Sequence, residues 1–198
     1  MEKPFSERLE NWIDSKGPKN LDTLVEAFGD KSFAVIMFVF MLFPAIPLPT
    51  AAHVFEAIVI LIAGQMVIGR RSLWLPKFLT KRVKLARAVK SKFMKKVIGR
   101  VKWLEIKAGP YGQGLFRTPA IDRVFGVIII LLCLTAFFAP PLSGLDTLPS
   151  LGVVLISLSI LLENVFLLAA GLVVGASGVL LGFFFIEAIL NLFIRLFS

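Results

Sequence analysis

The residues best suited to chemistry lie beside two proline-rich breaks in long apolar runs. His53 and Glu56 follow the first break at a spacing of three, which places both on one face of a helix. Asp146 lies in the second break. An ionisable group inside an apolar segment costs roughly 2.5–3.5 kcal/mol at the bilayer centre and therefore marks a functional position. These three residues could relay a proton or bind a hydroxyl-rich ligand, and a purely structural His–Glu hydrogen bond is the alternative.

Further contacts to such a ligand would come from the breaks themselves. Prolines free backbone carbonyls and expose helix N-termini, so the candidate binding set also includes Pro47, Pro49 and Pro141. Glu163 and Glu187, which bracket the last apolar run, are weaker candidates.

The sequence does not favour an enzyme. It contains no Gly-rich phosphate loop followed by Lys-Ser/Thr, no Ser/His/Asp order in polar loops and no metal-ligand cluster. The single histidine argues against a His-rich zinc or haem site, and the single cysteine, Cys133, excludes an intramolecular disulfide. We therefore predict a protein without metal, cofactor or catalytic residues.

The first break divides the apolar stretch from Phe33 to Pro76. Pro44, Pro47 and Pro49 fall within six residues, so no straight helix continues through them. Each flanking run has about 16 or 17 residues, or roughly 25 Å of helix, against a bilayer core of about 30 Å. Met37–Leu48 is apolar enough to face lipid. This pattern predicts a helical hairpin that either spans the membrane or re-enters it.

The second half of the chain repeats this arrangement. The apolar run Ile121–Pro141 is broken by prolines and glycine, and a second apolar run follows at Leu148–Leu162. Paired, interrupted hydrophobic segments are typical of repeat-built membrane proteins with a central site. If both hairpins re-enter, their tips should pack together around one polar pocket, because unpaired backbone groups cannot face lipid.

Composition defines the class. Hydrophobic residues make up 57% of the chain, aromatic residues 12%, and the mean hydropathy is +0.85. The predicted fold is an all-α integral membrane protein with two proline-broken helical hairpins as an internal repeat, amphipathic interfacial helices and a terminal transmembrane helix. Its predicted segments are 1–31 (N-terminal, amphipathic), 32–68 (hairpin 1), 69–123 (basic), 124–164 (hairpin 2) and 165–198 (terminal helix).

Charge predicts the orientation. Between Gly69 and Lys107 there are fourteen Lys and Arg against one Glu, whereas the whole chain carries +9. Basic loops stay in the cytoplasm, so segment 69–123 and the N-terminus should lie inside. The residues expected at the membrane surface are Arg70, Arg71, Trp74, Lys90, Lys95, Arg100 and Trp103.

Two further regions have helical periodicity. From Val83, the residues Ala86, Val89, Phe93, Val97, Val101 and Leu104 share one helix face, and basic residues cover the rest. This helix anchors the protein or binds anionic headgroups or a polymer, and no motif indicates nucleic acid. Near the N-terminus, Asn20 should cap a helix that ends at Gly29, after a shorter helix containing Phe5, Leu9, Trp12 and Ile13. These helices lie against the basic helix or on the membrane.

The order of these features resembles the ExoD family of bacterial exopolysaccharide-synthesis proteins. The most specific matches are Pro47-Leu48-Pro49-Thr50, Gln65-Met66-Val67-Ile68-Gly69-Arg70 and Leu73-Trp74-Leu75-Pro76. The chain departs from the family at Ala51-Ala52-His53 and around Asn164. The resemblance implies a bacterial inner-membrane protein for exopolysaccharide synthesis or export, acting with the polysaccharide or its assembly machinery.

Two main functional hypotheses follow, and a membrane enzyme that uses His53 with Glu56 as an acid/base pair is a third, weaker alternative. In the first, the protein is a non-catalytic component of exopolysaccharide production. In the second, it is a small transporter or lipid-handling protein with a mid-membrane site at the two tips. The spacings Gly171-x-x-x-Gly175 and Gly178-x-x-x-Gly182 also predict close helix contact, either within the chain or across a homodimer.

Overall fold

The computed structural model describes residues 4–42, 44–45, 52–70, 72–76, 92–116, 118–140 and 143–197. Within these ranges the chain is helical and contains no strand, which confirms the predicted all-α class. In chain order the elements are α1 (Phe5–Asp14), α2 (Leu21–Phe28), the 3-10 turn η1 (Gly29–Lys31), α3 (Ser32–Met41), α4 (Ala52–Val67), α7 (Lys92–Ala108), α8 (Gln113–Phe116), α9 (Pro119–Phe137), α10 (Thr147–Leu162) and α11 (Val165–Phe197).

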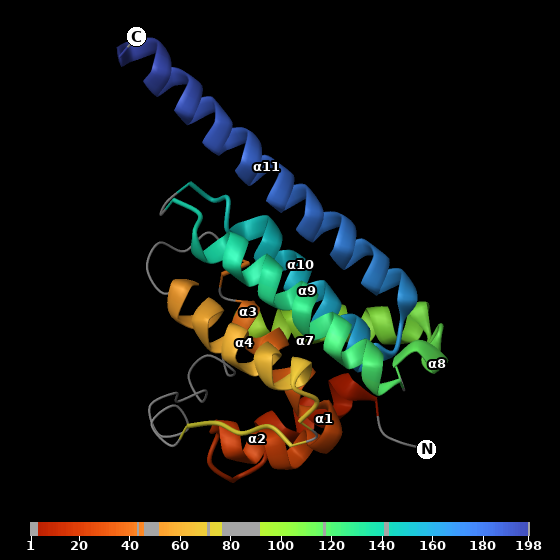
Figure 1. Cartoon of the computed structure of the whole chain (residues 1–198). Coiled ribbons are helices and arrows are strands. Elements are labelled where there is room, and N and C mark those ends of the chain that lie inside the picture. The colour runs from red at the N-terminus through yellow and green to blue at the C-terminus, as the bar shows by residue number, and fades with distance from the viewer. Residues whose placement is uncertain are drawn as a thin grey trace.

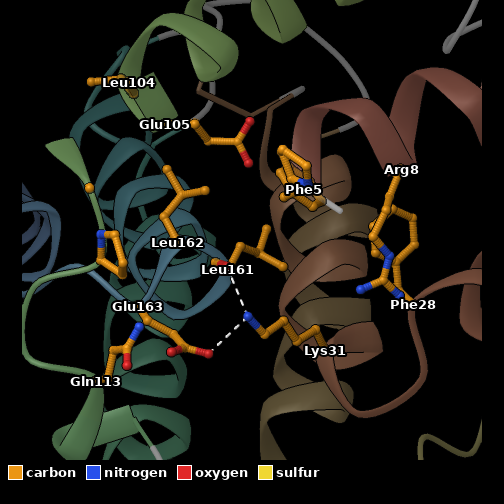
Figure 2. Close-up of a pocket in the computed structure, with 13 residues that line it drawn as sticks. Phe5, Arg8, Phe28, Lys31, Leu104, Glu105, Gln113, Leu161, Leu162 and Glu163 are labelled. Carbon is orange, nitrogen blue, oxygen red and sulfur yellow. Dashed lines mark hydrogen bonds and ion pairs between the residues drawn. The ribbon is translucent and has the colours of Figure 1, made fainter. Parts of the chain in front are cut away.

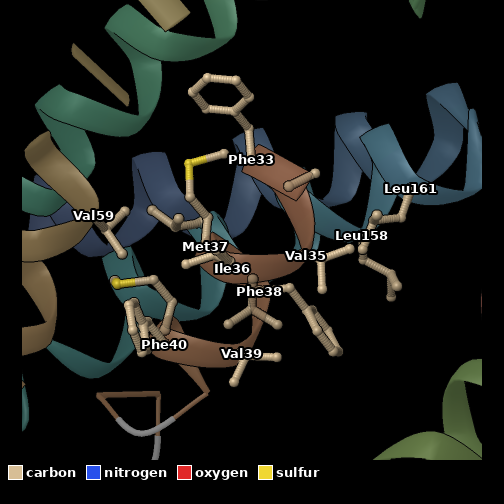
Figure 3. Packing of buried hydrophobic residues seen from close by; sticks show 14 of the residues in the cluster. Phe33, Val35, Ile36, Met37, Phe38, Val39, Phe40, Val59, Leu158 and Leu161 are labelled. Carbon is tan, nitrogen blue, oxygen red and sulfur yellow. The ribbon is translucent and has the colours of Figure 1, made fainter. Parts of the chain in front are cut away.

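The short helix α3 forms the centre of the fold. All ten of its residues are buried, and Figure 3 shows their side chains pointing outward in every direction into the surrounding helices. A helix that is apolar on every side must be covered on every side. Residues 37–42 are apolar enough to face lipid, as the sequence indicated, but their side chains contact protein instead.

The helices around α3 are arranged as antiparallel pairs (Figure 1). Lys31, at the start of α3, bonds to the C-terminal end of α10, so these two helices run in opposite directions. The Phe40 and Phe55 rings, 5.7 Å apart, join the end of α3 to the start of α4. His53 and Phe137, with ring centroids 5.4 Å apart, join the start of α4 to the end of α9. One end of the bundle therefore collects both interhelical breaks.

Glycines allow the closest helix contacts. A Cβ built on Gly152 of α10 would lie 2.6 Å from the Cα of Gly175 in α11, and one built on Gly171 would lie 2.9 Å from the backbone nitrogen of Ile156. Between α4 and α9, a Cβ on Gly126 would lie 2.8 Å from the carbonyl oxygen of Ala63. The close contact predicted for Gly171-x-x-x-Gly175 is therefore made within the chain.

Among the described residues, two helices are long and apolar enough to cross a membrane, over Ala120–Phe137 and Val165–Glu187. Only 33% and 22% of these windows are buried in the protein, so most of each surface faces outward. Helix α11 has 33 residues, or about 50 Å, and Figure 1 shows it extending past the other helices to the C-terminus. The internal repeat and membrane re-entry stay predictions, and the central parts of both tips (46–51 and 141–142) lie outside the described residues.

The N-terminal helices match their sequence signals. The Asn20 side chain accepts a hydrogen bond from the Thr23 amide at 3.0 Å, and Gly29 ends α2 with φ +51°. Helix α1 buries the four predicted apolar residues and packs on α7. Of the two locations expected for α1, against the basic helix or on the membrane, the structure has the first.

The apolar face of the basic helix differs from the one predicted. Helix α7 begins at Lys92 in the described chain, and it buries Met94, Ile98 and Val101, while Phe93 is exposed. Residues 83–91 lie outside the described ranges. Because the buried face contacts protein, it is not available to lipid.

The glycine contacts lead to a stability prediction. Gly152→Ala should lower the free energy of unfolding by about 1–3 kcal/mol, because the new methyl group meets backbone rather than a movable side chain. Gly64→Ala is the matched control, since a Cβ at this α4 position has nothing within 4 Å and alanine favours a helix. Thermal unfolding in detergent measures both variants. Equal midpoints would contradict the proposed packing of α10 on α11.

Candidate functional site

The end of the bundle that contains both breaks holds a buried carboxylate. Glu56, on the first half of α4, has a fully buried side chain, and its Oε2 accepts a hydrogen bond from His53 Nδ1 at 3.0 Å. Its Oε1 has no hydrogen-bond partner among the described residues. Buried polar atoms normally have partners, because leaving one unsatisfied costs about 1–3 kcal/mol. Helical spacing alone predicts the His53–Glu56 contact, but burial of Glu56 follows only from the surrounding helices.

The third predicted residue lies near this pair. Asp146 precedes the first residue of α10 and is close enough to act electrostatically on Glu56. In the first turn of the same helix, the hydroxyl groups of Thr147 and Ser150 are buried and also lack partners among the described residues. The structure therefore brings His53, Glu56 and Asp146 to one end of the bundle, together with unsatisfied polar atoms.

This arrangement has a defined chemical capability. The His53 side chain is 45% exposed, whereas Glu56 is 0% exposed, so the pair joins an accessible imidazole to a buried carboxylate. Imidazole gains and loses protons near neutral pH, and a carboxylate within hydrogen-bond distance can receive a proton from it. The described residues contain no group of three or more His, Cys, Asp or Glu side chains that could hold a metal ion.

The predicted proline contacts lie mostly outside the described chain. Pro47, Pro49 and Pro141 fall in ranges that the structure does not describe, so their place in the site stays a prediction. Pro44, the first proline of the break, is described and buried just after α3.

The opposite end of the bundle contains a cavity of about 340 Å³ (Figure 2). Lys31 donates to the Leu161 carbonyl at 3.2 Å and pairs with Glu163 at 3.0 Å, which fixes the ends of α3 and α10. Glu163 itself adopts a left-handed conformation with φ +50° at the end of α10. This weaker sequence candidate thus has a structural contact, whereas Glu187 is exposed on α11.

A second carboxylate connects the N-terminal helix to this end. Glu105 of α7 accepts hydrogen bonds from the Ser6 amide at 3.2 Å and from the Ser6 hydroxyl. A carboxylate near the N-terminus of a helix is favourable because it meets free amides and the positive end of the helix dipole. Glu105, the single acidic residue between Gly69 and Lys107, therefore has a specific structural position.

Five of the residues predicted at the membrane surface are described, and all five are exposed: Arg70, Trp74, Lys95, Arg100 and Trp103. Arg71 and Lys90 lie outside the described residues. Exposure is what a surface role requires, although it is equally compatible with solvent.

Two polar residues, Gln65 and Asn164, have structural functions that were not predicted from the sequence. Gln65 Nε2 donates to the Trp74 carbonyl at 3.0 Å, and the Trp74 amide donates to Gln65 Oε1 at 2.8 Å. The Gln65 side-chain amide therefore pairs with the Trp74 backbone in the way that a peptide group would. Asn164 caps α11 by accepting from the Leu167 amide at 3.0 Å and donates to the Gly109 carbonyl at 2.8 Å. An Asn before an apolar helix was the available signal for the second function.

Fold and site together define an all-helical protein with two helices apolar enough to cross a membrane and a polar cluster at one end of its bundle. The sequence profile described as "Exopolysaccharide synthesis, ExoD" matches residues 5–184, and this chain belongs to the ExoD family. The chain is also similar to an uncharacterized protein of Synechocystis sp., with 23% identity over 175 residues that cover 85% of this chain and 81% of the relative. No solved structure matches it.

Glu56 and Glu163, which lie at opposite ends of the bundle, should respond oppositely to neutralisation. Glu56→Gln should leave the free energy of unfolding unchanged or raise it by about 1 kcal/mol, because it removes a buried charge with an unpaired oxygen. Glu163→Gln should lower it by up to about 1 kcal/mol, since Lys31 loses its ion pair. Thermal unfolding in detergent compares the two. A larger loss for Glu56→Gln would show that the Glu56 carboxylate is structural.

Proposed function

We propose that this protein is an inner-membrane component of exopolysaccharide synthesis or export that acts without catalytic chemistry of its own. The observation that carries the proposal is the family match, because it extends over residues 5–184 and so includes both helical hairpins and the polar cluster. The largely outward-facing apolar surfaces of α9 and α11 support the membrane location. The partners of this function are the polysaccharide or the machinery that assembles it.

The distribution of charge supports a cytoplasmic orientation for the end of the bundle that contains Lys31. Helix α7 packs on α1 at this end through Glu105 and Ser6, and its exposed residues are mainly basic. The exposed basic residues of α7 are Lys92, Lys95, Lys96, Arg100, Lys102 and Lys107. Phe93, Trp103 and Ile106 of α7 are also exposed, so α7 would meet anionic headgroups through these basic side chains together with three apolar ones. The opposite end, with His53 and Glu56, then lies deeper in or across the membrane.

A gene deletion tests the first function. The deletion strain should produce less exopolysaccharide or release a different fraction of it, and a plasmid copy of the wild-type gene should restore the yield. Colorimetric sugar determination on cell-bound and released fractions measures this. The Glu26→Gln variant, which changes an exposed carboxylate of α2, is the control and should complement fully. Normal yield, surface location and release in the deletion strain would contradict the proposal.

A second function, transport through a site at the end of the bundle that contains His53 and Glu56, is favoured by Glu56 Oε1, which has no hydrogen-bond partner among the described residues. The ionisable groups that act on this carboxylate are His53 from its own helix and Asp146 from the start of α10. In this proposal the accessible imidazole of His53 passes a proton to Glu56, and the site conducts protons across the membrane.

Proteoliposomes test this second function directly. With a pH gradient imposed across the membrane, the wild-type protein should carry protons inward, as an entrapped pH-sensitive dye reports. Glu56→Gln should lower the rate at least tenfold because an amide cannot take up the proton, and Glu26→Gln should leave it unchanged. A wild-type rate equal to that of empty liposomes, or an unaltered rate in Glu56→Gln, would contradict the relay.

A further inference from the structure

A narrow groove follows the C-terminal half of α4. It has a volume of about 240 Å³, and its walls include Ile58, Leu61 and Ile68 from the helix and Trp74 and Leu75 from the extended segment 72–76. Ile58 and Ile68 lie about 15 Å apart along the axis of α4, so the groove is an elongated apolar depression on the surface. Arg70 lines the end of the groove that lies beyond the helix terminus.

Side-chain hydrogen bonds hold the two walls of the groove in place. Gln65 makes two hydrogen bonds to the Trp74 backbone, at 2.8 and 3.0 Å, and its amide nitrogen also donates to the Leu61 carbonyl at 3.3 Å. The extended segment is therefore attached to α4 at a fixed position. These hydrogen bonds hold segment 72–76 against α4, so the second wall of the groove has a fixed position.

The apolar walls of the groove face outward. Leu61 is 59% exposed, Ile68 76% and Trp74 59%, although each is large and apolar. Exposed apolar surface of this kind, continuous with a cavity, marks a site for an apolar partner. The elongated shape and the open side fit a hydrocarbon chain that lies along the helix.

The polar end of the groove carries positive charge. Arg70 is exposed and forms no ion pair within the described part of the chain. The Arg123 guanidinium packs against Gly69, with Nη2 only 3.1 Å from the position of an added Cβ, so a second cation lies at the same end. Guanidinium groups bind phosphate oxygens, and Trp prefers the boundary between headgroups and hydrocarbon.

We propose that this groove binds one anionic phospholipid, with an acyl chain along Ile58, Leu61 and Ile68 and the phosphate at Arg70. An acyl chain matches the apolar walls, and a negative phosphate at one end matches the position of the cations. The proposal rests on the membrane location proposed above, and it assigns a specific lipid site to residues 58–75. It is distinct from the basic surface of α7.

Trp74 provides a direct reporter for this site. The full-length Trp103→Phe protein, in phosphatidylcholine vesicles, retains Trp74 in the groove and Trp12, which is only 7% exposed. Lipids brominated on the acyl chain quench nearby indole fluorescence on contact. Brominated phosphatidylglycerol should quench with about fivefold higher apparent affinity than brominated phosphatidylcholine, as expected for about 1 kcal/mol from one basic residue.

Variants separate the specific site from general surface charge. Arg70→Gln should remove the preference for phosphatidylglycerol, whereas Arg100→Gln, an exposed position on α7, should retain it. Leu61→Ser should weaken quenching by both lipids. Soluble glycerol phosphate should not displace the lipid, because it cannot fill the apolar walls.

The experiment distinguishes failure of the lipid site from failure of the proposed membrane function. Equal quenching by the two lipids, or an unchanged preference in Arg70→Gln, would overturn the lipid site while leaving the membrane location intact. Absence of quenching by either lipid, with protein that washes off the vesicles in alkaline carbonate, would overturn both the lipid site and the proposed membrane function.

Discussion

The structure depends on covering α3, a helix without a polar face. After Ser32, its nine further residues are phenylalanine, methionine, valine, isoleucine and alanine, and each of the ten is 6% exposed or less in the fold. A helix of about 15 Å is too short to cross a bilayer core of about 30 Å, so in lipid alone at least one end of the helix would lie in the hydrocarbon. The surrounding helices provide the cover, and their arrangement follows from this requirement.

Covering α3 also determines where the polar groups lie. Because α10 runs antiparallel to α3, the Lys31–Glu163 pair lies at one end and the residues that follow the breaks lie at the other. The antiparallel pairing of α4 with α9 places His53 and Glu56 at the same end as Asp146. Two groups of ionisable residues are thus separated by the length of the apolar core, and the two ends have different chemistry. The Lys31 end has paired charges, whereas the Glu56 end has a buried carboxylate oxygen that meets no hydrogen-bond partner in the described part of the chain.

Close approach of helix backbones completes the core. Gly152, Gly171 and Gly175 let α10 and α11 meet with backbone atoms in contact, which attaches the first half of α11 to the core. Its later residues, including Phe183, Phe184 and Ile186, remain exposed. The same helix therefore supports the core with its glycine-rich half and offers an apolar surface to the surroundings with its other half, as the shape in Figure 1 indicates.

The sequence by itself determined the helical class, the family, the caps of α2 and the apolar face of α1. These properties depend on composition, on motifs and on spacings within one or two helical turns, all of which are local. It also placed His53 and Glu56 on one helix face for the same reason. Tertiary structure alone decided that α3 faces protein rather than lipid, since an evenly apolar helix is equally suited to both.

Tertiary structure also decided the partners of residues distant in sequence. Glu105 lies 99 residues from Ser6 and Lys31 lies 130 from Leu161, and no periodicity connects such positions. The hydrogen bonds of Gln65 to Trp74 depend on how the chain turns after α4, where Gly69 has φ +79°. Which glycines contact a neighbour and which do not, such as Gly152 and Gly64, depends on how the helices pack, because the residue type is the same at both positions.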